Sequence, residues 1–325
     1  MSLVRVLAGS LLLGLVCRFA VAPVAAQSDY PSRPISLVMP FTAGGAGDIL
    51  ARAIADELKA ELNQSVVVEN IPGAGGEIAA AQIARSTPPD GYKMMWASPG
   101  PLSYAPNVHL TKPPYDPLRD FAPVSTLGVY SSLLVVHQSV PVHNFKELVA
   151  YARANPGKLA YGTSNSTGVA TMAQLARAAD IDMLHIPYKG ESQAMPDLMT
   201  GRIHLMIVAP TTMEQLEGRA TPVVALGPHR TSLFPNVPTA AEEGVQGINI
   251  VQWLGFVMPG CTPKPIVEKM SQAMNRALAK PEIKKKAELS GTIVSGSTPE
   301  QMAELLKTQL EAWREAVKIA NLPTD

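Results

Sequence analysis

Hydrophobic positions along the chain fall into short apolar runs that alternate with segments of helical spacing. Residues 35–39, 66–69 and 92–97 are runs with the length and composition of buried strands. Between them, residues 48–62 and 77–85 place apolar side chains at intervals that repeat with the helical turn. The order strand, helix, strand, helix, strand is typical of a parallel sheet with right-handed crossovers. The first third of the chain is therefore predicted to form an α/β domain.

A second α/β series follows a proline-rich, polar stretch at residues 107–123, which is predicted to be a loop. Extended segments at residues 121–129 and 132–136 mark the passage from one domain to the next. Residues 228–247 hold turn signals and are expected to contain one short helix. Further helices are predicted at residues 145–154, 169–179, 192–200, 265–279, 282–288 and 299–320, and further strands at residues 159–161, 183–186, 205–208, 223–226, 250–258 and 292–294.

These elements predict an α/β protein of two domains, each a mostly parallel sheet flanked by helices. Residues 27–128 and 229–325 are assigned to domain 1 and residues 129–228 to domain 2, so the chain crosses between the domains twice. An α/β sheet usually binds its ligand beyond the carboxyl ends of its strands. Two loops at such ends, residues 41–47 and 162–168, are expected to face each other as a hinged clamp.

The first 26 residues have the features of a secretory signal peptide. Arg5 supplies a positive start, residues 6–16 are apolar, and small residues occupy the cleavage-determining positions of Val24-Ala25-Ala26. We therefore expect export and cleavage after about Ala26. The apolar run is too short to span a bilayer and Arg18 interrupts its extension, which disfavours the alternative of an uncleaved anchor helix. No later segment is apolar for long enough to cross a membrane.

The composition fits a globular protein with two cores. The 325 residues are 46% hydrophobic and 17% charged. Loss of Arg5 and Arg18 with the leader takes two from the 27 basic residues, and the 27 acidic residues then give a formal charge of −2. No basic excess points to nucleic acid. Cys17 also leaves with the leader, so Cys261 has no partner for an internal disulfide.

The loop after the first strand combines a strand end, a glycine cluster and a helix start. Pro40 ends the strand, because proline cannot donate to the strand ladder. Three glycines within residues 44–47 permit backbone angles closed to other residues and leave room for a ligand. Asp48 is predicted to be the N-cap of the helix, accepting the N–H groups of Leu50 or Ala51. Free N–H groups and the positive end of a helix favour an anion, so we predict half of a carboxylate-binding site here.

The second loop, residues 162–168, is rich in neutral hydrogen-bonding side chains and precedes a helix. Hydroxyl and amide groups of this kind can bind a carboxylate without any arginine. The alternative is an ordinary helix-capping loop, because Ser, Thr and Asn cap helices in any protein. The side chains concerned are Thr163, Ser164, Asn165, Ser166 and Thr167.

Nucleotide and metal sites have no support in the sequence. The glycines of residues 44–47 lack the dinucleotide-binding spacing, and the chain has no Walker-type phosphate loop, no His-Glu-x-x-His and no Cys-x-x-Cys. We predict no metal and no cofactor. Residues 162–166 nearly match a nucleophile elbow centred on Ser164, although serine replaces its second glycine. With His204 and His229 downstream, a secreted α/β hydrolase using Ser164 is the alternative function.

Nine short motifs, in order over nearly the whole mature chain, resemble one known family. They are YPSRPI at 30–35, PFTAGGAGD at 40–48, VENIPGAGG at 68–76, DGY at 90–92, IPYKG at 186–190, DLMTG at 197–201, FPNVPT at 234–239, WLGFVMP at 253–259 and GSTPE at 296–300. On these motifs the chain is similar to the Bug family, the periplasmic solute-binding receptors of tripartite tricarboxylate transporters. Each motif is weak alone, but their number and order make the resemblance specific.

The resemblance implies a non-catalytic periplasmic receptor with a two-domain Venus flytrap fold that closes on a small organic carboxylate or dicarboxylate. Delivery to integral-membrane transporter subunits would follow; a sensor subunit that presents its loaded form to a signalling receptor is a further alternative. We also expect the chain to be monomeric. The ligand contacts implied are Phe41, Thr42, Ala43, Gly44 and Gly45 from the first loop, Thr163, Ser164, Asn165, Thr167, Gly168 and Val169 from the second, and Ser98 after the third strand. Tyr188, which follows a later strand, is an additional candidate for the cleft wall.

Two departures from the family's pattern bear on the ligand. The second loop is richer in hydroxyls than usual, and Thr171 stands where relatives often carry histidine. Residues 208–210 are apolar where many relatives have an acidic residue, which favours an aromatic or dicarboxylic acid over an amino acid. Asp48 is interpreted as an organiser of its loop rather than a ligand contact, because Arg52 one turn later can neutralise it.

Overall fold

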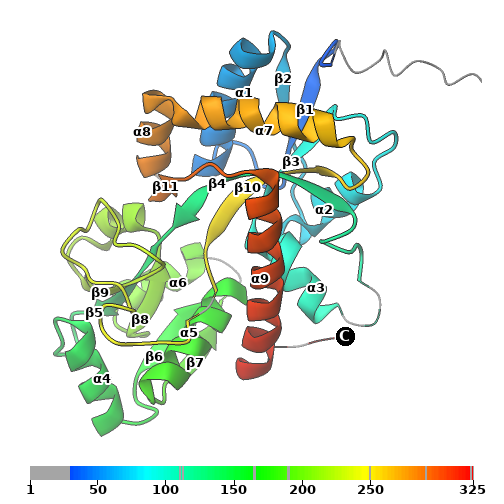
Figure 1. Cartoon of the computed structure of the whole chain (residues 1–325). Coiled ribbons are helices and arrows are strands. Elements are labelled where there is room, and N and C mark those ends of the chain that lie inside the picture. The colour runs from blue at the N-terminus through cyan, green and yellow to red at the C-terminus, as the bar shows by residue number, and fades with distance from the viewer. Residues whose placement is uncertain are drawn as a thin grey trace, which may run out of the picture. The chain divides into compact units, whose positions relative to one another are not determined.

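The structure is a computed structural model that describes residues 30–109, 111, 113–163, 166–188, 191–248, 250–289, 291–322 and 324 (Figure 1). The chain separates into residues 1–30 and a unit of residues 31–325, and the fold is that of the second unit. The predicted signal peptide, residues 1–26, lies outside the described residues. So do Ser164 and Asn165 of the second loop.

The first sheet has six strands in the order β11-β4-β10-β3-β1-β2. Strand β1 pairs in parallel with both β2 and β3, whereas β10 runs antiparallel to β3 and to β4, and β11 runs antiparallel to β4. The strands are β1 (Ile35–Met39), β2 (Val66–Asn70), β3 (Lys93–Ala97), β4 (Phe121–Tyr130), β10 (Trp253–Pro259) and β11 (Thr292–Val294).

The second sheet has five strands in the order β7-β6-β8-β5-β9. Here β6 pairs in parallel with β7 and β8, and β5 lies antiparallel between β8 and β9. The strands are β5 (Ser132–His137), β6 (Ala160–Thr163), β7 (Leu184–Pro187), β8 (Leu205–Val208) and β9 (Ala220–Leu226).

Both sheets are mixed, so the prediction of mostly parallel sheets is wrong, although the α/β class is right. The physical reason lies in the crossings between the sheets. A parallel pair needs a long crossover, usually a helix, to bring the chain back to the same edge. Strand β4 instead continues into β5 through Ser131, and the chain returns to the first sheet through residues 227–252 without a described helix. Strands β5 and β10 therefore enter their sheets in the opposite direction.

The helices agree with the predicted segments to within about three residues at each end. They are α1 (Ala46–Leu62), α2 (Glu77–Ala84), α4 (Phe145–Ala154), α5 (Ser166–Ala179), α6 (Glu191–Met199), α7 (Lys264–Ala279), α8 (Pro281–Leu289) and α9 (Pro299–Ile319). Short helical turns that were not predicted are η2 (Ala74–Gly76), η3 (Gly100–Tyr104), α3 (Ala105–Val108) and η4 (Pro210–Leu216).

Two segments predicted between the main elements, residues 107–123 and 228–247, differ from their predictions. Residues 107–123 were expected to be a loop, but α3 occupies their start, held by Asn107, whose amide donates to the carbonyls of Ser103 and Leu310. The short helix expected within residues 228–247 is not present among the residues described there, which form turns. Pro235 and Pro238 lie in this segment, and proline inside a helix removes a backbone hydrogen bond and so disfavours it.

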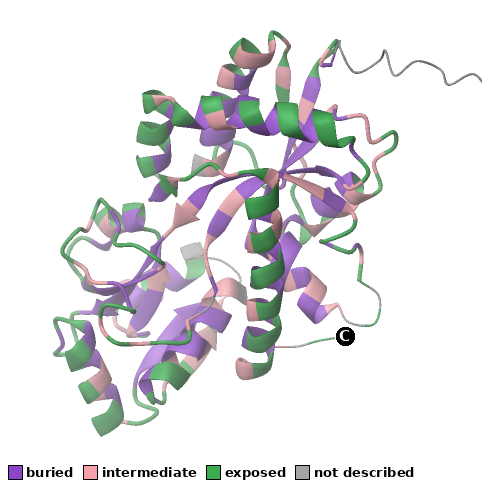
Figure 2. Ribbon diagram, viewed as in Figure 1, coloured by how far each residue is buried: buried purple, intermediate pink, exposed green. Residues whose placement is uncertain are grey.

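The strands of both sheets hold many buried residues (Figure 2), and apolar ones among them form a separate core on each sheet. In the first, Ile83 of α2, Leu102 of η3 and Leu306 of α9 pack with buried residues of the strands, Val257 among them. Trp253 at the start of β10 belongs to the same core and is fully buried.

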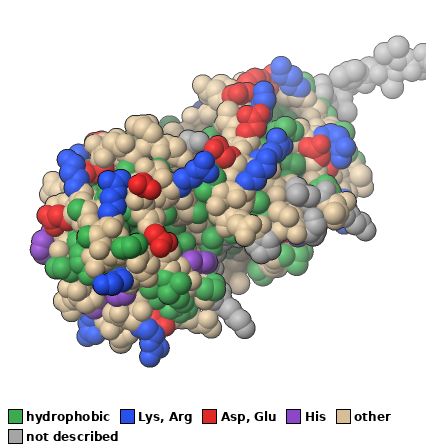
Figure 3. Space-filling view, turned by 90° about the horizontal axis from the view of Figure 1, so that it is seen from below, with side chains coloured by type: hydrophobic (Ala, Val, Ile, Leu, Met, Phe, Trp, Pro, Cys, Tyr) green, Lys and Arg blue, Asp and Glu red, His purple; other side chains and the backbone are tan. Residues whose placement is uncertain are grey.

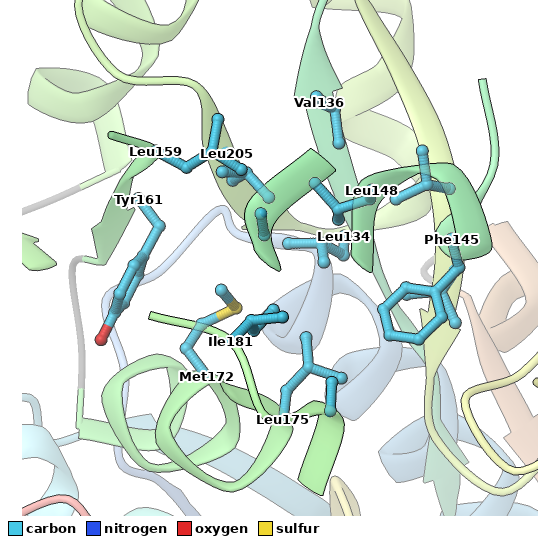
Figure 4. Packing of buried hydrophobic residues seen from close by; sticks show 14 of the residues in the cluster. Leu134, Val136, Phe145, Leu148, Leu159, Tyr161, Met172, Leu175, Ile181 and Leu205 are labelled. Carbon is cyan, nitrogen blue, oxygen red and sulfur yellow. The ribbon is translucent and has the colours of Figure 1, made fainter. Parts of the chain in front are cut away.

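In the second core, side chains from α5 meet one face of β5, a strand that is buried on both faces. Figure 4 shows Met172 and Leu175 of α5 facing Leu134, with Phe145 and Leu148 of α4 beside it. These helices therefore hold the sheet on which the second loop is mounted.

A third cluster joins α5 of the second sheet to α9 and α3. Ala170 of α5 is fully buried against Trp313 and Ala316 of α9, and the Trp313 ring meets Tyr104 edge to face at 5.4 Å. This contact, the α5–α9 seam, lies one helical turn behind the second loop. Within the described part of the chain, no helix is both long enough and apolar enough to cross a membrane.

Candidate functional site

The first loop leaves the backbone donors of α1 open at its start. Gly44 has a φ of +88°, a left-handed conformation that favours glycine, and Gly45 is the N-cap, with no side-chain cap hydrogen bond. The first N–H groups of a helix have no partner within it, so this turn offers donors and a positive dipole end. Residues 41–45 are exposed.

Asp48 lies within the first turn of α1, so its prediction as the N-cap is wrong. The helix begins at Ala46, two residues before Asp48, and the carboxylate reaches back to the loop instead of forward. Its Oδ2 accepts the Gly44 N–H at 3.0 Å and Arg52 Nε at 3.0 Å, while Oδ1 accepts Asn70 Nδ2 at 2.8 Å and Arg52 Nη2 at 3.1 Å. The Asn70 amide also donates to the Phe41 carbonyl at 3.0 Å.

These hydrogen bonds tie the loop to the end of β2. Those from Arg52, the Gly44 N–H and Asn70 lower the pKa of Asp48 to about 2, although its side chain is almost fully buried. The carboxylate is therefore ionised and paired at neutral pH. Its charge is balanced by Arg52 and by the hydrogen bonds that it accepts from the Gly44 N–H and the Asn70 amide.

A cleft of about 690 Å³ is lined by residues of both sheets. Five of the predicted contacts line it: Phe41 from the first loop, Ser98 directly after β3, and Thr163, Thr167 and Gly168 from the second loop. Gly47 of the first loop lines it as well. The predicted contacts Thr42, Ala43, Gly44 and Gly45 lie between the lining residues Phe41 and Gly47 in the chain, and Val169 follows Gly168, but these five do not themselves line the cleft.

Thr163 ends β6 and is buried, with its Oγ1 2.7 Å from His185 Nε2. The His185 ring stacks on Tyr161 with ring centroids 5.0 Å apart, and burial lowers the pKa of His185, which favours the neutral ring. In the tautomer that carries its proton on Nε2, His185 donates to Thr163. The hydroxyl proton of Thr163 is then available to an acceptor in the cleft.

Tyr188 does not line the cleft. Its hydroxyl donates to Asp197 Oδ2 at 2.8 Å, and burial and Asp197 together raise the pKa of Tyr188 to about 12. A Cβ added to Gly162 would lie 3.2 Å from the Tyr188 ring, so the ring packs against that glycine of β6. The position of Tyr188 after a strand suggested that it would line the cleft. Its hydroxyl instead donates to Asp197 of α6.

Several polar residues of the cleft wall were not predicted. Tyr130 and Ser132 flank the first crossing between the sheets, and Gln252 lies on the second crossing, just before β10. The Tyr130 hydroxyl donates to Gln252 Oε1 at 2.8 Å, and burial raises the pKa of Tyr130 to about 12. The sequence could have pointed to these residues through the two predicted crossings between the domains, because residues where two domains join often line the space between them.

The rest of the wall is largely apolar and carries little charge. Met39, Leu50, Trp96, Val208 and Leu254 supply apolar surface. Of the described residues that line the cleft, Glu77 is the only charged one, and none is Lys, Arg or His. In the part of the chain that the structure describes, no three His, Cys, Asp or Glu side chains gather as a metal site would require. An anion here would be held by N–H and O–H groups.

The sequence model described as "Tripartite tricarboxylate transporter family receptor" matches residues 50–322. The chain belongs to this family. Among curated proteins, the receptor is 31% identical to Protein BugT of Bordetella pertussis over 309 residues, 91% of this chain and 92% of BugT.

Two solved structures show the same fold. The periplasmic binding protein BugD is 31% identical, with a TM-score of 0.73, and the match covers 91% of the receptor and 100% of BugD. An R. palustris protein solved with adipate is 32% identical, with a TM-score of 0.74, over 91% of the receptor and 100% of that chain. The resemblance to the Bug family and the two-domain periplasmic-binding-protein fold are therefore confirmed, and the receptor belongs with periplasmic solute-binding proteins.

The surface of the receptor fits its balanced composition. Figure 3 shows basic and acidic side chains interspersed on one face, without a patch of a single sign. Equal numbers of basic and acidic residues in the whole chain agree with this view.

Proposed function

We propose that the receptor captures a small organic carboxylate or dicarboxylate between the loops of its two sheets and delivers it to a membrane permease. The cleft carries this proposal, because it joins the start of α1, through Gly47, to Thr163 at the end of β6 and Thr167 in the first turn of α5. Helix starts of this kind favour anions. The adipate in the R. palustris relative is a dicarboxylate, which supports the same ligand class.

Binding would proceed by closure of the two domains on the ligand. The domains proposed are residues 27–128 with 229–325, and residues 129–228, after removal of the leader at about Ala26. Hydroxyls of Thr163 and Thr167 and the N–H groups of the helix starts would surround one carboxylate, and the apolar wall would cover its carbon chain. Contacts made only in the closed state would supply the free energy of closure.

A thermal-shift panel of carboxylates tests the proposal. A true ligand at 100 times its Kd is expected to add about 2.7 kcal/mol to the free energy of unfolding. Amino acids, sugars and inorganic phosphate serve as the comparison panel. If no carboxylate stabilises the receptor while an ester hydrolysis is lost on Ser164→Ala, the protein is a hydrolase and the proposal fails.

Replacing Thr167 with alanine is expected to weaken carboxylate binding by about 1–3 kcal/mol, because the variant loses a hydroxyl donor to a buried anion. The Kd from isothermal titration should rise by roughly 5- to 150-fold. Thr308→Ala is the matched control, since Thr308 is an exposed threonine on α9, away from the cleft. Equal affinities for Thr167→Ala and the wild type would place the carboxylate elsewhere.

A further inference from the structure

Glu77 occupies the cleft wall beside the first loop. It begins α2, directly after η2, where Gly76 is buried and has a φ of +101°. A Cβ on Gly76 would lie 3.2 Å from Pro40 and 3.3 Å from Pro101, so this turn is wedged between the loop after β1 and η3. The packing fixes where Glu77 begins its helix and holds its negative charge near the proposed carboxylate site.

The charge of Glu77 is only partly matched by its neighbours. His109 Nε2 lies 3.1 Å from Glu77 Oε2, and the Glu77 side chain is 23% exposed. His109 is the one cation-capable side chain of the described residues that forms an ion pair with Glu77, and it carries charge only when protonated. Burial, with a smaller contribution from the nearby Glu77 charge, raises the pKa of the Tyr115 phenol. Glu77 itself lines the cleft, so its carboxylate lies in the wall that a ligand would meet.

We propose that Glu77 sets the charge preference of the cleft, favouring a monocarboxylate that carries a neutral hydrogen-bond donor, such as a hydroxyl, over a dicarboxylate of the same length. This inference rests on the proposed function and narrows its ligand class. A carboxylate side chain accepts hydrogen bonds and donates none, so a ligand hydroxyl is complementary to it and a second ligand carboxylate is not. Discrimination of this kind comes from repulsion of the wrong ligand as well as attraction of the right one.

The expected size of the effect follows from Coulomb's law. Two like charges several ångströms apart, in surroundings between protein and water, repel by an amount equivalent to roughly tenfold in affinity. The apolar wall offers the same surface to the carbon chain of either ligand. The change in the preference between equal-length ligands when Glu77 is substituted therefore isolates the charge of Glu77.

Isothermal titration with matched ligand pairs tests the inference. The pairs are adipate with 6-hydroxyhexanoate and succinate with 4-hydroxybutanoate, and the measured quantity is the Kd of the diacid divided by that of the hydroxy acid. This ratio should exceed one in the wild type, fall by about tenfold in Glu77→Gln and fall further in Glu77→Lys. Glu282→Gln, an exposed glutamate on α8 with the same change of net charge, should leave the ratio unchanged.

The outcomes separate this inference from the proposed function. A ratio below one in the wild type, or a ratio that is the same in Glu77→Gln and Glu77→Lys as in the wild type, overturns the role of Glu77 while carboxylate binding stands. Absence of binding by every carboxylate overturns the proposed function and the inference with it. Melting temperatures of both variants, compared with Glu282→Gln, show that the ratio is measured on folded protein.

Discussion

The Asp48→Ala variant is expected to lose about 3 kcal/mol of folding free energy and most of its ligand affinity. The substitution removes the nearly buried carboxylate that accepts the Gly44 N–H, takes one of its two acceptors from the Asn70 amide, and leaves Arg52 with Asn70 Oδ1 but without its charged partner. Orphaned donors cost about 1–3 kcal/mol each, which is discounted here because Arg52 is half-exposed. Urea denaturation measures the stability, and isothermal titration with the ligand found by the carboxylate panel measures the affinity.

Asp56→Ala provides the comparison, since Asp56 is an exposed aspartate on the same helix. Its stability should stay within about 0.5 kcal/mol of the wild type. If Asp48→Ala were as stable as Asp56→Ala and bound ligand normally, the loop would hold its shape without the carboxylate.

The pairing of Asp48 also has a pH signature. Its pKa is about 2 in the folded protein and 3.8 without its partners, so its contribution to stability is complete above pH 3.8 and is lost as the pH falls towards 2. The contribution amounts to about 2 kcal/mol. In Asp48→Asn this part of the acid-induced loss should vanish, which denaturation at a series of pH values would detect.

Gly45→Val is expected to fold normally and to bind ligand on the order of 100-fold more weakly. The backbone of Gly45 is extended, with a φ of −73°, and a Cβ there meets nothing within 4 Å. Valine therefore fits the unliganded protein, with a small loss for an N-cap without a hydrogen-bonding side chain. In the liganded state its two methyl groups would fill the space through which the anion reaches the open N–H groups of α1.

Two neighbouring variants sharpen this prediction. Gly45→Ala adds one methyl group and should show a smaller loss of affinity. Gly44→Val, by contrast, should lower stability because the φ of Gly44 is +88°. Full affinity in Gly45→Val, with an unchanged melting temperature, would mean that the ligand does not approach this face of the loop.

The hydrophobic pattern predicted the elements well because burial alone sets where most of them lie. Strands β8 and β11 and helix α4 have the predicted bounds. Strand direction was not predictable in the same way, since it depends on where the chain leaves one sheet for the other. The N-cap prediction failed for a related reason: Asp48 finds Asn70, a partner 22 residues away on β2, which no local pattern encodes.

The residues of the candidate site also fall into those that a local pattern predicts and those that it does not. The loops at strand ends could be recognised by their glycine and hydroxyl content, and five of the contacts predicted in them line the cleft. Residues that reach the cleft from elsewhere, such as Glu77 and Gln252, carry no local mark of it. Tyr188 is the reverse case. Its position after a strand predicted a place in the cleft wall, but its hydroxyl donates to Asp197 and the residue does not line the cleft.

The three tryptophans lie in three different places, so their fluorescence can report on different parts of the receptor. Trp96 lines the cleft, Trp313 sits in the α5–α9 seam, and Trp253 is enclosed in the first core. Their emission therefore reports on the cleft wall, on the junction behind the second loop and on the first core. Phenylalanine at any two of these positions would leave a single reporter, so that occupancy of the cleft and motion at the seam can be timed separately in a stopped-flow mixing experiment.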